Sequence, residues 1–177
     1  MKIYKLNLKH NNKKYIGNNK FLINACESGK MNIVKYLVEH GANINEVTVN
    51  GKTTLFYACR SGNENLVKYL VKLGVDIDKE DHSGKTPLFI ACWKGNKNII
   101  KYLVEQGALI NKEDNRDKTL LFYTCENDNI KIVKYLVDFG ADINKIDKRG
   151  ENLLFSLCKS KNEYIIKYLV EHGVENK

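Results

Sequence analysis

The sequence has 177 residues and no long hydrophobic run. None of its apolar stretches approaches the roughly 18 residues that a membrane-spanning helix needs. The first residues, MKIYKLNLKHNNKKY, also lack the apolar segment and the small-residue cleavage site of a secretory signal. We therefore expect no membrane association and a location in the cytosol, with the nucleus as the alternative.

The sequence also lacks the residue sets that point to catalysis. Its four histidines are scattered, and none shares a repeating pattern with Ser and Asp or with Cys. Gly-Lys-Thr occurs at 51–53 and 84–86, but a P-loop needs a second glycine five residues before the first residue of this triplet. Glu46 and Lys79 stand at those two positions. We predict no enzymatic activity, no nucleotide site and no cofactor.

What the sequence does contain is one pattern that recurs every 33 residues. The string KYLV begins at residues 35, 68, 101, 134 and 167. A glycine keeps the same interval at 41, 74, 107, 140 and 173. So do all five cysteines, Cys26, Cys59, Cys92, Cys125 and Cys158. A fixed period of this length is typical of a solenoid built from stacked structural repeats.

Each repeat is predicted to form two short helices and a hairpin-like connection. In the third repeat, Thr86 is placed to cap the first helix and Pro87 to occupy its first turn. Asn96 is placed to cap the second helix, which Gly107 ends. Helices this short are unstable alone, so we predict that neighbouring repeats stack to bury their apolar faces. The residues equivalent to Asn96 are Asn63, Asn129 and Asn162.

The order of motifs in the third repeat resembles the ankyrin repeat. It runs Gly-x-Thr-Pro-Leu, a pair of small residues, Gly, a second apolar helix and Gly-Ala. The best match is GKTPLFIACWKGNKNIIKYLVEQGALIN at 84–111. The resemblance implies an all-α repeat solenoid of stacked helix-turn-helix pairs with hairpin-like fingers, which the family uses chiefly to bind other proteins. It covers five repeats, 18–50, 51–83, 84–116, 117–149 and a truncated 150–177. Residues 1–17 are expected to be a basic N-terminal arm or a cap.

Two features depart from the family pattern. Asp128 and Lys161 stand where the first three repeats carry a glycine between their two helices, so we expect a different geometry at these junctions. Phenylalanine also replaces the usual histidine of the first helix, which exchanges a hydrogen bond for buried area. The residues concerned are Phe56, Phe89, Phe122 and Phe155.

The regular spacing of the cysteines suggests either a chemical role or a packing role. Equivalent positions in stacked helices lie about 8–10 Å apart. A disulfide needs Cα atoms within about 7 Å, and zinc ligands must converge to about 2.3 Å from the metal. We therefore predict reduced cysteines that serve as small apolar residues between helices, and no metal site.

The net charge of +8 is unevenly distributed. Residues 1–17 hold five lysines and no acidic residue, and the third repeat has six basic and three acidic residues. The resemblance implies a contact surface, here called the concave face, that consists of the finger tips and the exposed side of the first helices. This face carries nine Lys or Arg residues and three Glu residues, which makes it selectively basic. The candidate partner-binding residues are Lys52, Arg60, His82, Lys85, Trp93, Lys94, Arg116, Lys118, Glu126, Lys148, Arg149 and Lys159.

Trp93, the only tryptophan, follows the small pair Ala91-Cys92 at a position that the ankyrin family turns toward its ligand. We predict that Trp93 is an exposed anchor with a basic rim. The alternative is that it packs against the neighbouring first helix. The equivalent residues in the other repeats are all charged, which argues against a core position: Glu27, Arg60, Glu126 and Lys159.

We predict a monomeric, non-catalytic module that binds another protein, and an acidic segment of that partner on the concave face. The alternative is a nucleic-acid-binding protein that uses the basic N-terminal arm and the same face. A single tryptophan disfavours this alternative, because proteins that bind single strands stack successive bases on several aromatic side chains.

Overall fold

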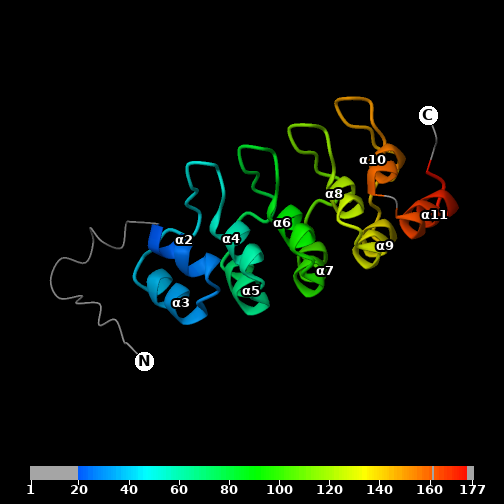
Figure 1. Cartoon of the computed structure of the whole chain (residues 1–177). Coiled ribbons are helices and arrows are strands. Elements are labelled where there is room, and N and C mark those ends of the chain that lie inside the picture. The colour runs from blue at the N-terminus through cyan, green and yellow to red at the C-terminus, as the bar shows by residue number, and fades with distance from the viewer. Residues whose placement is uncertain (1–19, 161, 175–177) are drawn as a thin grey trace.

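The computed structural model describes residues 20–160 and 162–174, and the side chains of 158–160 lie outside this description. The described residues form five pairs of helices (Figure 1). The first helices of the pairs are α2 (Lys20–Glu27), α4 (Thr54–Ser61), α6 (Pro87–Lys94), α8 (Leu120–Glu126) and α10 (Leu153–Ser160). The second helices are α3 (Met31–Glu39), α5 (Glu64–Lys72), α7 (Lys97–Glu105), α9 (Ile130–Asp138) and α11 (Glu163–Glu171).

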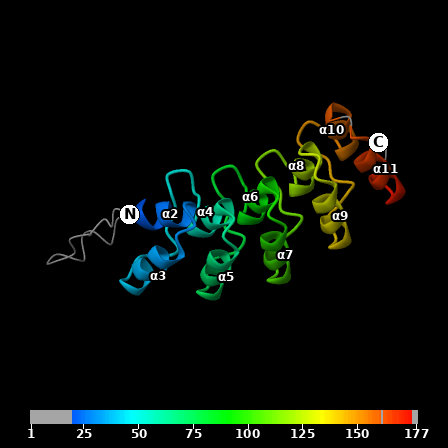
Figure 2. The same cartoon turned by 60° about the horizontal axis from the view of Figure 1, so that its bottom comes forward.

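The pairs stand side by side in one continuous row, with the α2–α3 pair at one end and the α10–α11 pair at the other (Figures 1 and 2). The first helices pack against one another in the order α2, α4, α6, α8 and α10, and each also packs against the second helix of its own pair. The long connections project as fingers from the side of the first helices. The predicted all-α repeat solenoid is confirmed.

The core is the same set of contacts repeated along the row. Leucines at one position of the first helices, Leu55, Leu88 and Leu121, have no exposed surface. Val67 and Val133 in the second helices are equally buried. Burying one such side chain stabilises the folded state by about 1.5–3 kcal/mol. Contacts within each helix pair and between neighbouring repeats both contribute to the core.

Two of the predicted helix caps differ from expectation. Thr86 has the extended backbone of an N-cap, but no described group bonds its buried hydroxyl, and Pro87 follows at the first helical position as predicted. Asn96 makes no capping bond and instead donates its side-chain amide to the Cys59 carbonyl, 3.2 Å away in the preceding repeat. The caps predicted for Asn63, Asn129 and Asn162 are present.

The prediction of a different junction geometry at Asp128 is wrong. Asp128 has a φ of 55°, and the equivalent Gly62 and Gly95 have φ values of 77° and 72°. Aspartate is one of the few residues other than glycine that tolerate this left-handed conformation, so the junction keeps its shape. Lys161 lies outside the described residues.

The fingers are joined to one another at their tips. The His82 nitrogen donates to the Asn50 carbonyl at 2.9 Å, and the Asn115 nitrogen donates to the Ser83 carbonyl at 3.0 Å. This close approach requires glycine at Gly84, where φ is 80° and a Cβ would come within 2.8 Å of the Asn115 nitrogen. The fingers therefore form a connected ridge above the first helices.

The phenylalanines at the predicted positions are not all buried. Phe56, Phe89 and Phe122 expose 5% of their surface or less, as predicted, but Phe155 exposes 49%. The prediction is wrong at Phe155 because no further repeat stacks on α10 in the described chain.

Residues 1–17, predicted to be an arm or a cap, lie outside the described residues. None of the described helices has the length and apolar character needed to cross a membrane.

Candidate functional site

One buried aspartate in each of three fingers organises the concave face. Asp81 Oδ1 accepts hydrogen bonds from the Ser83 nitrogen at 2.8 Å, the Ser83 hydroxyl at 2.6 Å and the Lys85 nitrogen at 3.1 Å. Asp114 and Asp147 accept the equivalent backbone bonds. These bonds fix the turn from which Lys85 and its equivalents reach the first helices. The sequence analysis missed these aspartates, although their 33-residue spacing was visible.

Lysines of the concave face lie against aromatic rings. Lys52 Nζ is 4.9 Å from the centroid of the Phe56 ring, and Lys85 Nζ is 4.4 Å from that of Tyr123. On α6, Lys94 Nζ lies 5.0 Å from the Trp93 ring. Such contacts contribute about 0.5–1 kcal/mol at exposed sites, so the ammonium groups have preferred positions along the face.

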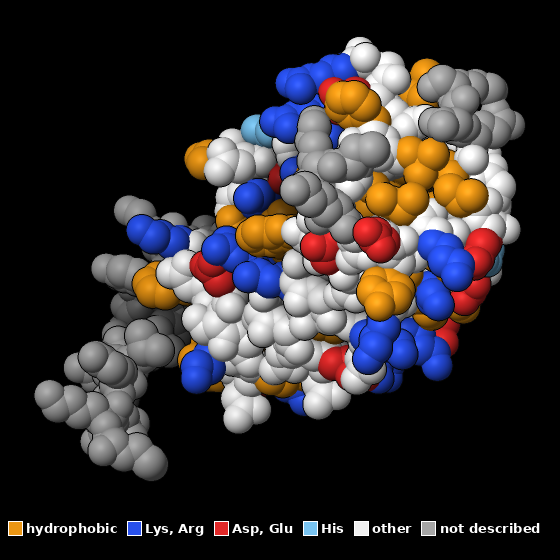
Figure 3. Space-filling view, turned by 45° about the vertical axis from the view of Figure 1, so that its right-hand side comes forward, with side chains coloured by type: hydrophobic (Ala, Val, Ile, Leu, Met, Phe, Trp, Pro, Cys, Tyr) orange, Lys and Arg blue, Asp and Glu red, His pale blue; other side chains and the backbone are white. Residues whose placement is uncertain are grey.

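Several predicted site residues are neutralised within the protein. Arg60 pairs with Glu27 at 3.2 Å, and Lys148 with Asp117 at 3.6 Å. Lys118, only 14% exposed, lies between Glu126 at 3.0 Å and Asp147 at 3.8 Å. Figure 3 shows acidic side chains among the basic and hydrophobic ones on the side turned to the viewer.

The basic character of the concave face is therefore concentrated in the second and third repeats. Lys52, Lys85 and Lys94 have no ion pair with any residue in the described part of the chain. The remaining predicted residues lie along the finger tips or on α10. His82, Arg116 and Arg149 are exposed, and the Lys159 side chain lies outside the described residues.

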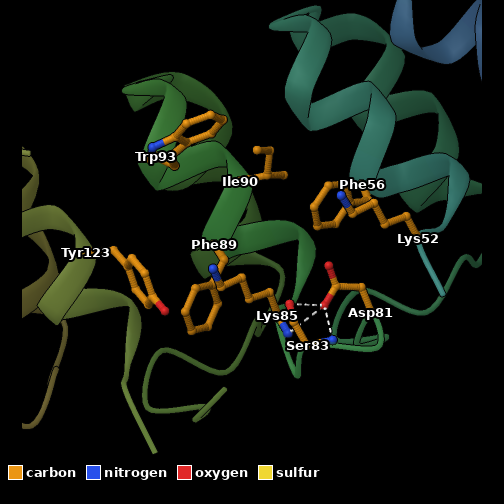
Figure 4. Close-up of a pocket in the computed structure, with 9 residues that line it drawn as sticks. All are labelled: Lys52, Phe56, Asp81, Ser83, Lys85, Phe89, Ile90, Trp93 and Tyr123. Carbon is orange, nitrogen blue, oxygen red and sulfur yellow. Dashed lines mark hydrogen bonds between the residues drawn. The ribbon is translucent and has the colours of Figure 1, made fainter. Parts of the chain in front are cut away.

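A pocket of about 380 Å³ opens in this part of the face, and we call it the central pocket. It combines three predicted site residues, Lys52, Lys85 and Trp93, with residues that the sequence analysis did not select. Trp93, which is 57% exposed, and the buried residues Phe89 and Ile90 line the pocket from α6, and Phe56 lines it from α4 (Figure 4). The complete lining is Lys52, Phe56, Asp81, Ser83, Lys85, Phe89, Ile90, Trp93 and Tyr123.

A family model for ankyrin repeats matches the chain in three overlapping stretches, residues 2–81, 22–114 and 107–177. The chain belongs to the ankyrin-repeat family. No curated protein matches it. Ankyrin repeats generally serve as protein–protein interaction modules. The concave face of this ankyrin-repeat protein is therefore the candidate surface for binding a partner.

Tyr123 closes one end of the central pocket of the ankyrin array. Its hydroxyl donates to Asp114 Oδ2, and its ring meets the edge of Phe89 with the centroids 5.6 Å apart. Burial, and then the Asp114 carboxylate, raises the pKa of the Tyr123 hydroxyl above its ordinary value. Tyr123 is therefore a protonated hydrogen-bond donor that is held in place by the finger.

The cysteines of this ankyrin-repeat protein lie in the core. The four whose side chains are described, Cys26, Cys59, Cys92 and Cys125, are buried and free. Burial raises the pKa of the Cys26 thiol to about 12, and burial with nearby acidic groups raises that of Cys125 to about 12. Burial therefore favours the neutral, protonated form of these thiols. Within the described residues, no group of three His, Cys, Asp or Glu side chains is placed to hold a metal ion.

Proposed function

We propose that this ankyrin-repeat protein is a non-catalytic interaction module that binds an acidic segment of a partner protein on its concave face. The observation that supports this function is the coincidence of the central pocket, the exposed Trp93 and three lysines. Lys52 and Lys85 line the pocket, and Lys94 Nζ lies 5.0 Å from the Trp93 ring. No described acidic side chain forms an ion pair with these three lysines.

The arrangement favours both tight binding of the partner and its rapid association. Aromatic anchors at the centre of an interface carry much of its binding energy, and Trp93 presents 57% of its surface for a partner to cover. Lysines that form no ion pair contribute a positive potential that speeds the approach of an acidic segment. The connected fingers hold these side chains in place before binding, which reduces the entropy lost when the partner is bound.

A capture experiment tests this function. The purified protein, Trp93→Ala and the double variant Lys52→Glu/Lys85→Glu are used to retain proteins from native lysate, which are identified by mass spectrometry. We expect a protein with an acidic segment to be retained by the parent protein and lost from both variants. Equal retention by all three proteins contradicts binding at the concave face.

The matched control is Lys72→Glu/Lys101→Glu, which reverses the same number of charges in the same two repeats. Both lysines are exposed on the second helices α5 and α7. The pair of Lys101 with Glu105 is exposed at 3.7 Å, and such pairs contribute about 0–1 kcal/mol. We expect this control to retain the partner.

The same variants test the nucleic-acid alternative. Labelled RNA and DNA are titrated with the protein at increasing salt. Sub-micromolar binding at physiological salt that is lost in Lys52→Glu/Lys85→Glu favours nucleic acid over protein as the partner. We expect only weak binding that disappears as salt rises, because few phosphate contacts are available.

A further inference from the structure

The three finger aspartates differ in what contacts their second carboxylate oxygen. Oδ2 of Asp114 accepts the Tyr123 hydroxyl, and Oδ2 of Asp147 lies 3.8 Å from Lys118 Nζ. Oδ2 of Asp81 accepts no hydrogen bond from any residue in the described part of the chain. In Figure 4 this oxygen is turned away from the dashed bonds that hold the other one. Asp81 lines the central pocket, so a free acceptor borders the pocket.

The sequence explains why Asp81 differs from Asp114. The residue nine positions after Asp114 is Tyr123, and the residue nine positions after Asp81 is Ile90. Isoleucine has no hydroxyl, and its side chain is shorter than that of tyrosine. The central pocket, which Ile90 lines, thus lies beside the repeat position at which the fourth repeat has the Tyr123 ring.

The surroundings of Tyr123 recur around the central pocket one repeat earlier. Lys85 Nζ lies over the Tyr123 ring, Phe89 meets its edge, and Asp114 accepts its hydroxyl. The equivalents of these three residues, 33 positions earlier, all line the central pocket: Lys52, Phe56 and Asp81. The pocket thus contains the equivalents of all three residues that hold the Tyr123 side chain, but no tyrosine between them.

We propose that the partner inserts a tyrosine side chain into the central pocket. Its ring packs against Phe56 below the Lys52 ammonium, and its hydroxyl donates to Asp81 Oδ2. This inference rests on the proposed function and adds the residue by which the acidic segment is anchored. A volume of about 380 Å³ accommodates one aromatic side chain, and acidic neighbours of the tyrosine would lie close to Lys85 and Lys94.

The acceptor gives the pocket a definite specificity. A phenylalanine fills the same space but leaves Asp81 Oδ2 covered and without a donor, which weakens binding by about tenfold or more. A phosphotyrosine brings two negative charges against the Asp81 carboxylate, so phosphorylation should weaken binding further. A pocket that recognised only negative charge would instead prefer the phosphorylated form.

The first test needs no partner. Ile90→Tyr places a tyrosine at the position of Tyr123 in the preceding repeat, and Ile90→Phe is the matched control that lacks only the hydroxyl. We expect Ile90→Tyr to have a higher melting temperature than Ile90→Phe, because only tyrosine can donate to Asp81. Equal melting temperatures, or a lower one for Ile90→Tyr, overturn the assignment of Asp81 as an available acceptor.

The second test uses four synthetic peptides in which one central residue is flanked on both sides by Glu and Asp. The central residue is Tyr, Phe, Ala or phosphotyrosine. Binding is followed by the anisotropy of a fluorescent label and by the emission of Trp93, the only tryptophan in the chain. We expect the Tyr peptide to bind most tightly, the Phe peptide about tenfold more weakly, and the other two more weakly still. In Ile90→Tyr, the Tyr and Ala peptides should bind equally.

The outcomes separate this inference from the proposed function. Equal affinities for the Tyr and Phe peptides, or the tightest binding by the phosphotyrosine peptide, overturn the tyrosine pocket. If all four peptides bind equally and Lys52→Glu/Lys85→Glu abolishes this binding, the acidic-segment function stands without the tyrosine. If none of the peptides binds, both proposals are wrong.

Discussion

Trp93→Ala gives the most direct measure of the proposed interface. A buried tryptophan removes about 200 Å² from water, within the usual range for aromatic side chains. Since Trp93 is 57% exposed, roughly 110 Å² remain for a partner to cover. At about 25 cal/mol per Å² this area corresponds to about 3 kcal/mol, or roughly a 100-fold loss of affinity in the variant.

The loss of folding stability in Trp93→Ala should be smaller than the loss of binding free energy. Less than half of the Trp93 surface is buried in the free protein, and the Cβ that alanine retains keeps part of those contacts. We expect a loss of about 1 kcal/mol, which lowers the melting temperature by roughly 2–4 °C in a chain of this size.

Two measurements decide between an anchor and a packing residue. Isothermal titration of the captured partner gives the affinity, and thermal unfolding followed by circular dichroism gives the stability. Trp93→Phe serves as the graded control and should lose less affinity than Trp93→Ala. Unchanged affinity in Trp93→Ala, or unfolding of the variant at room temperature, refutes the role of Trp93 as an anchor.

Three further predictions follow from the charges and the core. Lys85→Glu/Lys94→Glu should mainly slow partner association, and more strongly at low salt, as stopped-flow mixing can measure; a change confined to the dissociation rate contradicts electrostatic steering. Cys92→Ser should destabilise the protein by about 1–3 kcal/mol in urea unfolding, because a hydroxyl replaces a fully buried thiol; stoichiometric zinc in the parent protein would show a different role. The folded state raises the pKa of Cys26 from 9.0 to about 12, so its contribution to stability is complete below about pH 9 and is lost as pH rises toward 12. Unfolding in urea across that range should therefore depend less steeply on pH in Cys26→Ala than in the parent protein, and identical slopes contradict the raised pKa.

The fold was predictable because its determinants recur. Each repeat carries the same apolar positions, and Gly107 and its equivalents end the second helices. The local helix signals and the 33-residue period therefore indicate the same fold. The left-handed conformation of Asp128 was not predicted, because aspartate adopts it far less often than glycine does. The bond from Asn96 to the Cys59 carbonyl depends on the distance between repeats, which the sequence does not provide.

The candidate site was predictable only in part. The exposure of Trp93 follows from its position in the repeat, because the equivalent residues are charged. The neutralisation of Lys118 by Asp147 joins residues 29 positions apart, and it can be found only when the finger and the first helix are placed together. The central pocket was not predicted, because the contrast between Ile90 and its equivalent Tyr123 gains meaning only when the contacts of the Tyr123 ring are known.

The asparagines that begin the second helices bear on where the array opens first. Asn63 donates its amide to the Gly29 carbonyl at 2.9 Å, and Asn96 bonds the Cys59 carbonyl, so each joins its own repeat to the preceding one. A repeat in the middle of the row cannot detach without breaking contacts on both sides, whereas an end repeat breaks them on one side. Among the five described pairs, the third (α6 and α7) is the furthest from an end of the row, so its backbone amides should exchange with solvent most slowly. The central pocket is thus built around the helix pair that is expected to stay folded longest.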